Sequence, residues 1–127
     1  MNPNGKVALV TGAGKRIGRA LALALGDAGC RVAVHYKGSE KDALETAALI
    51  NSLAPGSEAV IIQADLADPK QVETLVASVA SRLGPLEILI NNASVFERTE
   101  LKYVDVDSWD RHFAINVRAP FLLGQSM

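Results

Sequence analysis

The sequence has one cysteine, few aromatic residues and no excess of charge of either sign. Cys30 alone excludes an intramolecular disulfide and a cysteine-cluster metal site, and we expect no metal centre. A formal net charge of −1 gives no general attraction to nucleic acid or to anionic membranes. No apolar run is long enough to span a bilayer, and the first residues lack the basic-then-apolar pattern of a signal peptide. These absences predict a cytoplasmic protein with small-molecule ligands.

The composition is that of an ordinary globular domain, with 127 residues of which 49% are hydrophobic and 21% are charged. Four short apolar runs alternate with helical patterns, as expected of strands buried on both faces of a parallel sheet. The expected strands are Lys6–Val10, Arg31–Tyr36, Ala59–Gln63 and Glu87–Asn91. Right-handed crossovers give the strand order 3-2-1-4, with a ligand across the carboxyl ends. The predicted fold class is α/β: a Rossmann-type, doubly wound parallel sheet, truncated after the fourth strand and the fourth main helix.

Start and stop signals place the first two helices between these strands. A helical pattern covers residues 17–28. A second helix is expected to begin near Ser39, with Asp42 three residues later in the manner of a capping box, and to end at the Pro-Gly pair of residues 55–56.

The last two helices are predicted from apolar spacing as well as from end signals. Asp68 is a candidate N-cap for a third helix that has Pro69 at its first position and ends at the Gly-Pro pair of residues 84–85. Its apolar side chains recur at Val72, Leu75, Val76, Val79 and Leu83. The last helix is expected to begin near Ser108 and to carry Trp109, Phe113, Val117, Phe121 and Leu122.

The most informative stretch is TGAGKRIG at residues 11–18. It follows an apolar strand and leads directly into a helix. Such a glycine-rich turn binds the pyrophosphate of a dinucleotide, because helix-start N–H groups point outward and absent side chains allow close approach. Lys15, Arg16 and Arg19 lie where cations are unfavourable unless an anion binds among them, although long side chains also extend into water. The stretch predicts a dinucleotide site.

The end of the second strand favours NADP(H) over NAD(H). A carboxylate usually binds the free ribose 2′-hydroxyl at this position, and the first acid here is Glu40, already on the next helix. Lys37, Ser39 and His35 instead offer donors to a 2′-phosphate, with Arg16 nearby in the fold. For His35 or Tyr36 alone, packing at a strand end is an equally good interpretation.

Polar residues also follow the third and fourth strands, where ligands of this fold bind. Asp65-Leu66 follows one strand and Asn91-Asn92-Ala93-Ser94 follows the other. A role in capping the loop explains Asp65 as well as ligand binding does, and turn formation explains the asparagine pair as well as ligand binding does. By themselves these residues leave both interpretations open.

The order and spacing of residues 11–18, Asp65, Asn91-Asn92-Ala93 and Asn116 resemble the short-chain dehydrogenase/reductase family over essentially the whole chain. Most members of that family have Gly where this chain has Arg16. Arg16, His35-Tyr36, Asn92-Ala93-Ser94 and Phe96 together resemble its pteridine reductase branch. The resemblance implies an NADPH-dependent oxidoreductase that transfers hydride to a pterin or folate.

The resemblance also implies roles for individual residues. Arg16 and Ser94 would contact the substrate as well, and Phe96 would stack a flat heterocycle against the nicotinamide, where packing of Phe96 in the core is the alternative. Asn116, the candidate catalytic residue, would stabilise a kink in the last helix and bind a water molecule of the proton relay. The alternative is that its side chain forms a hydrogen bond with a neighbouring helix. The cofactor site would comprise Gly12, Lys15, Arg16, Ile17, Gly18, His35, Tyr36, Lys37, Ser39, Asp65, Leu66, Asn92, Ala93 and Ser94.

The family's proton donor, a Tyr-x-x-x-Lys pair, does not occur in this sequence: Glu40 and Asp107 stand four residues after the two tyrosines. We therefore expect residues 1–127 to be a single NADP-binding Rossmann-type domain that lacks its carboxy-terminal catalytic half and is inactive alone. An apolar fourth strand at an open edge agrees with this. In the family the last helix forms a dimer interface, so a homodimer or homotetramer is expected.

Other functions remain open at this stage. A reductase of 3-oxoacyl groups or other carbonyls would use the same chemistry, although Arg16 and Phe96 favour a pterin. A nucleotide-binding module without catalysis would explain the missing tyrosine and lysine. A purely structural dimerisation domain would leave the glycine turn and its cations unexplained.

Overall fold

The computed structural model describes residues 2–53, 56–95 and 100–127. Four parallel strands form one sheet in the order β3-β2-β1-β4. They are β1 (Val7–Val10), β2 (Arg31–Tyr36), β3 (Glu58–Gln63) and β4 (Ile88–Ile90). The predicted fold class and strand order are thus confirmed, and the strand ends differ from the expected ones by at most one residue.

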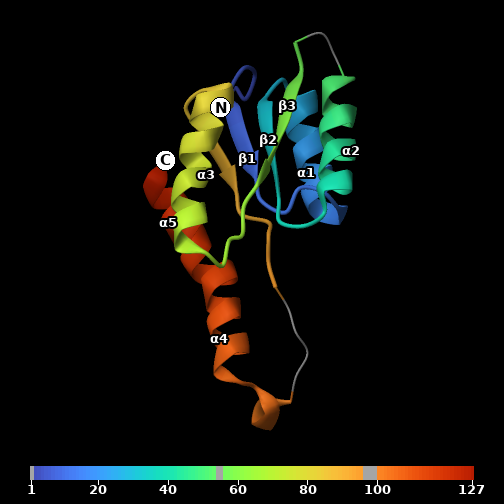
Figure 1. Ribbon diagram of the computed structural model, residues 1–127. Coiled ribbons are helices and arrows are strands. Elements are labelled where there is room, and N and C mark those ends of the chain that lie inside the picture. The colour runs from blue at the N-terminus through green and yellow to red at the C-terminus, as the bar shows by residue number, and fades with distance from the viewer. Residues whose placement is uncertain (1, 54–55, 96–99) are drawn as a thin grey trace.

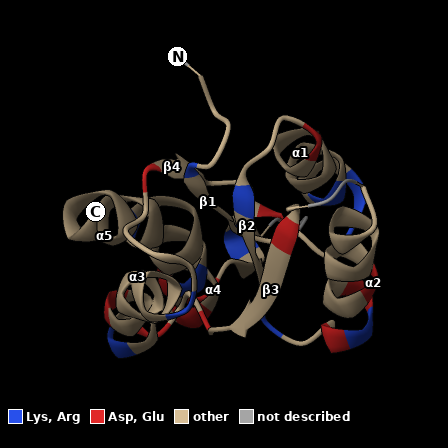
Figure 2. Ribbon diagram, turned by 90° about the horizontal axis from the view of Figure 1, so that it is seen from above, with Lys and Arg blue, Asp and Glu red and all other residues tan. Residues whose placement is uncertain are grey.

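Helices cover both faces of the sheet (Figures 1 and 2). Helices α1 (Arg16–Asp27) and α2 (Glu40–Asn51) lie on one face, and α3 (Pro69–Leu83) and α5 (Ala119–Ser126) lie on the other. Because side chains alternate along a strand, each face has its own apolar core. Within the described residues, no helix has both the length and the apolar character needed to cross a membrane.

Helix α3 matches its predicted signals closely. The Asp68 carboxylate accepts a bond from the Lys70 amide at 3.0 Å, and the Gln71 side chain donates to Asp68 at 3.2 Å. The helix ends at Leu83, and Gly84 adopts a positive φ of 114°. Its buried residues are the five that the spacing predicted, Val72, Leu75, Val76, Val79 and Leu83.

Helix α2 begins directly after Ser39, as predicted, but the capping box does not form. The Ser39 side chain makes no capping hydrogen bond. Asp42 instead forms an ion pair with Lys15, with Oδ2 and Nζ 3.2 Å apart. The helix ends at Asn51, earlier than expected. Pro55, one of the two residues at which this helix was predicted to end, lies outside the described residues.

The last helix differs most from its prediction. Helix α4 (Val106–Phe113) begins earlier than Ser108, because Asp105 is the N-cap and accepts from the Ser108 amide at 2.7 Å. It continues into a five-residue π segment, η2 (Ala114–Arg118), before α5. Pro120 has no N–H to donate to the Asn116 carbonyl, which explains why the helix widens there. A short 3₁₀ turn, η1 (Leu101–Tyr103), precedes α4.

Candidate dinucleotide site

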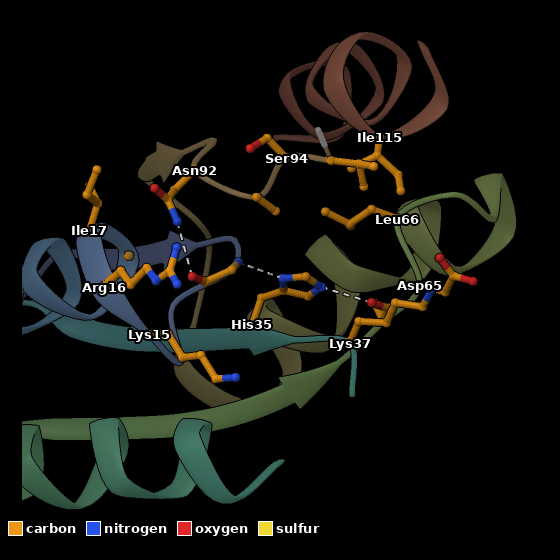
Figure 3. Close-up of a pocket in the computed structure, with 15 residues that line it drawn as sticks. Lys15, Arg16, Ile17, His35, Lys37, Asp65, Leu66, Asn92, Ser94 and Ile115 are labelled. Atoms are coloured by element: carbon orange, nitrogen blue, oxygen red, sulfur yellow. Dashed lines mark hydrogen bonds between the residues drawn. The ribbon is translucent and has the colours of Figure 1, made fainter. Parts of the chain in front are cut away.

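A cavity of about 410 Å³ opens at the carboxyl ends of the strands, next to the glycine turn (Figure 3). All but two of the residues expected to bind the cofactor line it. Its lining consists of Gly12, Lys15, Arg16, Ile17, Gly18, His35, Lys37, Ala64, Asp65, Leu66, Asn92, Ala93, Ser94, Val95 and Ile115. Tyr36 and Ser39 are outside this lining: Tyr36 packs against the core beneath α1 and α2, and Ser39 is the first residue before α2.

The glycine turn permits no side chain at Gly18. A Cβ atom there would overlap with the Gly12 carbonyl oxygen and approach Asn92 Nδ2 to 2.5 Å. Gly12 itself has a φ of +63°, in the region that favours glycine. The turn therefore packs its backbone directly against the loop that follows β4, which brings two walls of the cavity together.

Thr11, which directly follows β1, also connects the glycine turn to the loop after β4. Its buried hydroxyl accepts bonds from the backbone amides of Asn92 and Ala93, each at 3.0 Å. The Asn92 side chain donates to the Gly12 carbonyl at 3.1 Å. Asn92 therefore connects the loop after β4 to the glycine turn, far away in the sequence, and it also lines the cavity.

His35 is buried beneath the glycine turn, with 2% of its surface exposed. Its Nδ1 accepts a bond from the Gly12 amide at 3.0 Å, and its Nε2 lies 2.9 Å from the Ala64 carbonyl oxygen (Figure 3). Burial lowers the pKa of His35 from its ordinary 6.5, and the bond to Ala64 acts in the opposite direction. Both ring nitrogens are engaged, so of the two interpretations left open for His35 the structure favours packing at the strand end over a phosphate donor.

Arg16 occupies an unusual backbone position. Its φ is +51°, the only positive value among the described residues other than glycine. This explains why the corresponding position is usually glycine in the family that the sequence resembles. Arg16 and Lys15 both line the cavity and are exposed, and the Lys15 ammonium is also paired with the Asp42 carboxylate of α2 at 3.2 Å.

Arg19 does not contribute to the cavity, contrary to its predicted place among the phosphate-binding cations. Its guanidinium donates to the Gly14 carbonyl, the Thr46 hydroxyl and the Asp42 carbonyl, each at 3.0 Å. It also pairs with Glu45 at 3.3 Å. Arg19 therefore joins α1 to α2, because Glu45 pairs with its charge and oxygen atoms of Asp42 and Thr46 accept its hydrogen bonds.

Lys37 and Asp65 lie after β2 and β3 and both line the cavity. One carboxylate oxygen of Asp65 accepts from the Ala67 amide at 2.9 Å, which is the loop-capping role considered for it. Lys37 is exposed and its backbone carbonyl accepts from the Gln63 side chain at 3.1 Å. Asp65 therefore combines the loop-capping role with a place in the cavity lining.

The expected substrate side of the cavity is formed by the loop after β4 and by η2. Ser94 lines it, while Phe96 lies outside the described residues. The Asn116 side chain forms two bonds with Val95, accepting from its amide and donating to its carbonyl, each at 2.8 Å. Asn116 thus lies within the widened segment, as the expected kink requires, and its partner is a loop rather than a neighbouring helix.

Three lining residues were missed from the sequence: Ala64, Val95 and Ile115. Each directly neighbours a residue that was predicted, namely Asp65, Ser94 or Asn116. Their apolar side chains carried no chemical signal. Only their position, at a strand end or next to a polar site residue, could have indicated that they line the cavity.

The comparisons with known proteins agree with this geometry. The family model for short chain dehydrogenase matches residues 6–127. The chain belongs to the short-chain dehydrogenase family. It is 40% identical over 122 residues to versicolorin reductase 1 of Aspergillus parasiticus, covering 96% of this chain and 46% of that protein.

Two solved structures of short-chain dehydrogenase relatives give the same picture. A short chain dehydrogenase from Burkholderia cenocepacia in complex with NADP has a TM-score of 0.93 and 40% identity, covering 99% of this chain and 51% of that one. The FolM alternative dihydrofolate reductase 1 from Brucella canis, complexed with NADP, has a TM-score of 0.89 and 36% identity, covering 99% and 50%. This short-chain dehydrogenase chain therefore spans about half the length of the relatives it matches.

Proposed function

We propose that this chain binds NADP(H) and forms the cofactor-binding half of a short-chain reductase. The observation that carries the proposal is the set of cations that line the cavity. Lys15 and Arg16 from the glycine turn and Lys37 after β2 all line it. A 2′-phosphate accepts charge-assisted hydrogen bonds from such groups. The NADP complexes of two structural relatives support the same cofactor.

The cofactor, when bound, supplies the hydride that reduces a C=N or C=O bond, and a proton completes the reduction. The residues of this chain would bind and orient the cofactor: the start of α1 would face its pyrophosphate, and the cations would hold the 2′-phosphate. Asn116 fixes the loop after β4 through Val95. The Tyr-x-x-x-Lys proton donor of the family is not in these residues. Residues 1–127 are therefore proposed to be one incomplete domain.

For the substrate, we propose a flat heterocycle of the pterin or folate type. Arg16 and Ser94 line the cavity where such a ring would bind, and one structural relative is described as an alternative dihydrofolate reductase. A second candidate, reduction of a fused aromatic ring compound, is favoured by the similarity to versicolorin reductase 1 and to the trihydroxynaphthalene reductase PfmaI of Pestalotiopsis fici. Both classes present a planar ring system to the cofactor, which suits stacking.

The test is a titration of residues 1–127 with NADPH and NADH by calorimetry, followed by turnover assays of a longer protein that contains this chain, with an oxidised pterin and with a polycyclic quinone. Tighter binding of NADPH than of NADH supports the cofactor assignment. Turnover of the pterin supports the first substrate class, and turnover of the quinone alone supports the second. Binding without turnover of either favours a nucleotide-binding module, and no binding of NADPH overturns the proposal.

A further inference from the structure

Two side chains hold both polar backbone atoms of Gly12. Its amide donates to His35 Nδ1 at 3.0 Å, and its carbonyl accepts from Asn92 Nδ2 at 3.1 Å. His35 comes from β2 and Asn92 follows β4, so the glycine is held from both sides of β1. Its left-handed conformation, with a φ of +63°, is fixed by these two bonds.

The bond from Gly12 determines the chemical state of His35. An Nδ1 atom that accepts a hydrogen bond carries no proton, so the ring is neutral and Nε2 donates its proton to the Ala64 carbonyl at 2.9 Å. A second proton would place an N–H group opposite the Gly12 N–H. The bond to the glycine turn would then be lost, because neither group is an acceptor.

His35 therefore connects two walls of the cavity. Gly12 belongs to the glycine turn, and Ala64 directly precedes Asp65 at the end of β3; all four residues line the cavity. The charged groups that share the cavity with His35 are Lys15 and Arg16 of the turn, Lys37 after β2 and Asp65. The β4 loop and η2 contribute uncharged residues to the lining: Asn92, Ala93, Ser94, Val95 and Ile115.

We propose that His35 is a positioning residue whose neutral ring holds the Gly12 amide, keeps the glycine turn ready for the dinucleotide, and releases that turn when it is protonated. The inference rests on the proposed function and adds an acid-sensitive element to the same site. Burial supports it by lowering the pKa of His35, which keeps the ring neutral at pH 7. His35 acts through Gly12 and does not itself contact the phosphate.

Two substitutions separate the two bonds of the ring. In His35→Asn, the amide oxygen takes the position of Nδ1 and accepts from Gly12, but the side chain is too short to reach Ala64. In His35→Gln, the amide nitrogen reaches toward Ala64, and no acceptor remains beside Gly12. Both variants lack a titratable ring. The matched control is His112→Asn, which removes the second of the two histidines, on α4.

The first readout is independent of any cofactor. Nitrogen NMR of the intact protein at pH 7.5 reports the tautomer of His35, and amide hydrogen exchange reports the protection of Gly12. We expect a neutral ring with the proton on Nε2 and a protected Gly12 amide. Exchange at Gly12 should rise as the ring is protonated at lower pH. A ring protonated on Nδ1 at pH 7.5 overturns the proposal.

The second readout is the affinity for NADP⁺ from pH 7.5 to 5.0, given as the ratio between wild type and His35→Asn so that titration of the ligand cancels. We expect a ratio near one at pH 7.5 and a progressive loss of wild-type affinity as pH falls below 6.5. His35→Gln should bind about tenfold more weakly than His35→Asn at every pH, because its bond to the Gly12 amide is missing and neither variant has a titratable ring. His112→Asn should behave as wild type.

The outcomes distinguish this inference from the function on which it rests. A ratio that stays constant over the whole pH range overturns the role of His35, even if NADP⁺ binds tightly. Absence of NADP⁺ binding by a folded wild-type protein at pH 7.5 overturns the proposed function, and the NMR readout still decides whether His35 holds the turn. Circular dichroism at each pH confirms that the protein stays folded.

Discussion

At the residue scale, the backbone of the glycine turn determines which side chains the site tolerates. Gly18 has no room for a Cβ atom, since the Gly12 carbonyl and the Asn92 side chain already occupy that space. Arg16, two residues earlier, keeps a full side chain in a left-handed conformation with a φ of +51°. One position therefore excludes a side chain by contact, and the other accepts one at a cost in backbone strain.

Gly18→Ala is predicted to lower the free energy of unfolding by about 1–3 kcal/mol, because the new methyl group forces the turn away from the β4 loop. Urea denaturation followed by circular dichroism measures the change. The matched control is Gly124→Ala on α5, where a Cβ atom would meet nothing within 4 Å. That substitution should raise stability by about 0.5–1 kcal/mol through helix propensity. Equal effects at both positions would contradict the packing argument.

Arg16→Gly is predicted to separate stability from cofactor preference. Relief of left-handed strain opposes the extra entropy of the unfolded chain, so the free energy of unfolding should change by less than about 1 kcal/mol. Binding of NADPH should weaken by about 1–3 kcal/mol more than that of NADH, because one charge-assisted phosphate contact is lost. Calorimetry measures both, with Lys41→Ala, an exposed α2 cation outside the cavity lining, as control. Equal losses for both cofactors would show that Arg16 does not contact the 2′-phosphate.

At the element scale, the same kind of residue can stand before a helix with or without capping it. Asp68 precedes α3 and its carboxylate accepts from the Lys70 amide, whereas Ser39 precedes α2 and its side chain makes no capping bond. The side chain of Asp42, the expected partner in the α2 capping box, forms an ion pair with Lys15 of the glycine turn instead. A contact between two elements has replaced a local one.

Asp68→Ala is predicted to lower the free energy of unfolding by about 1 kcal/mol, since an amide at the start of α3 loses its acceptor. Ser39→Ala, the matched control at α2, should change it by no more than a few tenths of a kcal/mol. Chemical denaturation in the absence of cofactor measures both. A loss at Ser39 as large as that at Asp68 would mean that its hydroxyl caps α2 in solution.

The segment from α4 to α5 also depends on contacts that lie far apart in the sequence. Asn116 lies in the π segment and holds Val95 by two hydrogen bonds of 2.8 Å. Pro120, in the first turn of α5, removes the amide that an uninterrupted α-helix would need. The segment therefore widens at Asn116, whose side chain bonds to Val95 in the loop after β4. These bonds keep that loop beside the cavity.

At the scale of the whole molecule, α4, η2 and α5 present an apolar surface that the described part of the chain leaves uncovered. Trp109, Phe113, Val117 and Phe121 are between 48% and 65% exposed, and the rings of Trp109 and Phe113 stack with centroids 4.7 Å apart. Helix α4 extends beyond the carboxyl ends of the sheet (Figure 1). An exposed apolar surface of this kind indicates an interface, and we propose a homo-oligomer formed through it.

Val117→Lys is predicted to convert this oligomer into a monomer, because a charge would be buried without a partner at the centre of the interface. Sedimentation velocity should show the mass of the particle fall to that of one chain. Leu44→Lys on α2 is the control, with a similarly exposed residue of 51%, and should leave the mass unchanged. A wild-type protein that already sediments as a monomer would contradict the proposal.

Acid stability is also a property of the whole fold. Because the folded-state pKa of His35 is lowered from 6.5, the unfolded chain binds the proton more strongly below that pH. The contribution of the neutral ring is therefore complete above pH 6.5 and is lost as pH falls toward the folded-state pKa. The free energy of unfolding should decline over that range, and His35→Asn should decline less. Equal slopes for both proteins, measured by urea denaturation at a series of pH values, would contradict this assignment.

The sequence by itself determined the strand order, the two helix layers and the place of the cavity. Continuous apolar runs such as Val7–Val10 require burial on both faces, and glycines between a strand and a helix leave the backbone open to a phosphate. These are local signals, because each depends on neighbouring residues and on the period of one element. The α3 caps and its five buried residues were predictable for the same reason.

The tertiary structure alone decided which polar groups were already bonded. Arg19 and His35 carry the chemistry of phosphate donors, yet one joins α1 to α2 and the other holds Gly12 and Ala64. The partners lie on other strands and helices, so no local pattern identifies them. A hydrogen-bonding group can serve a ligand only when folding has left it without a closer partner, and that depends on the assembled fold.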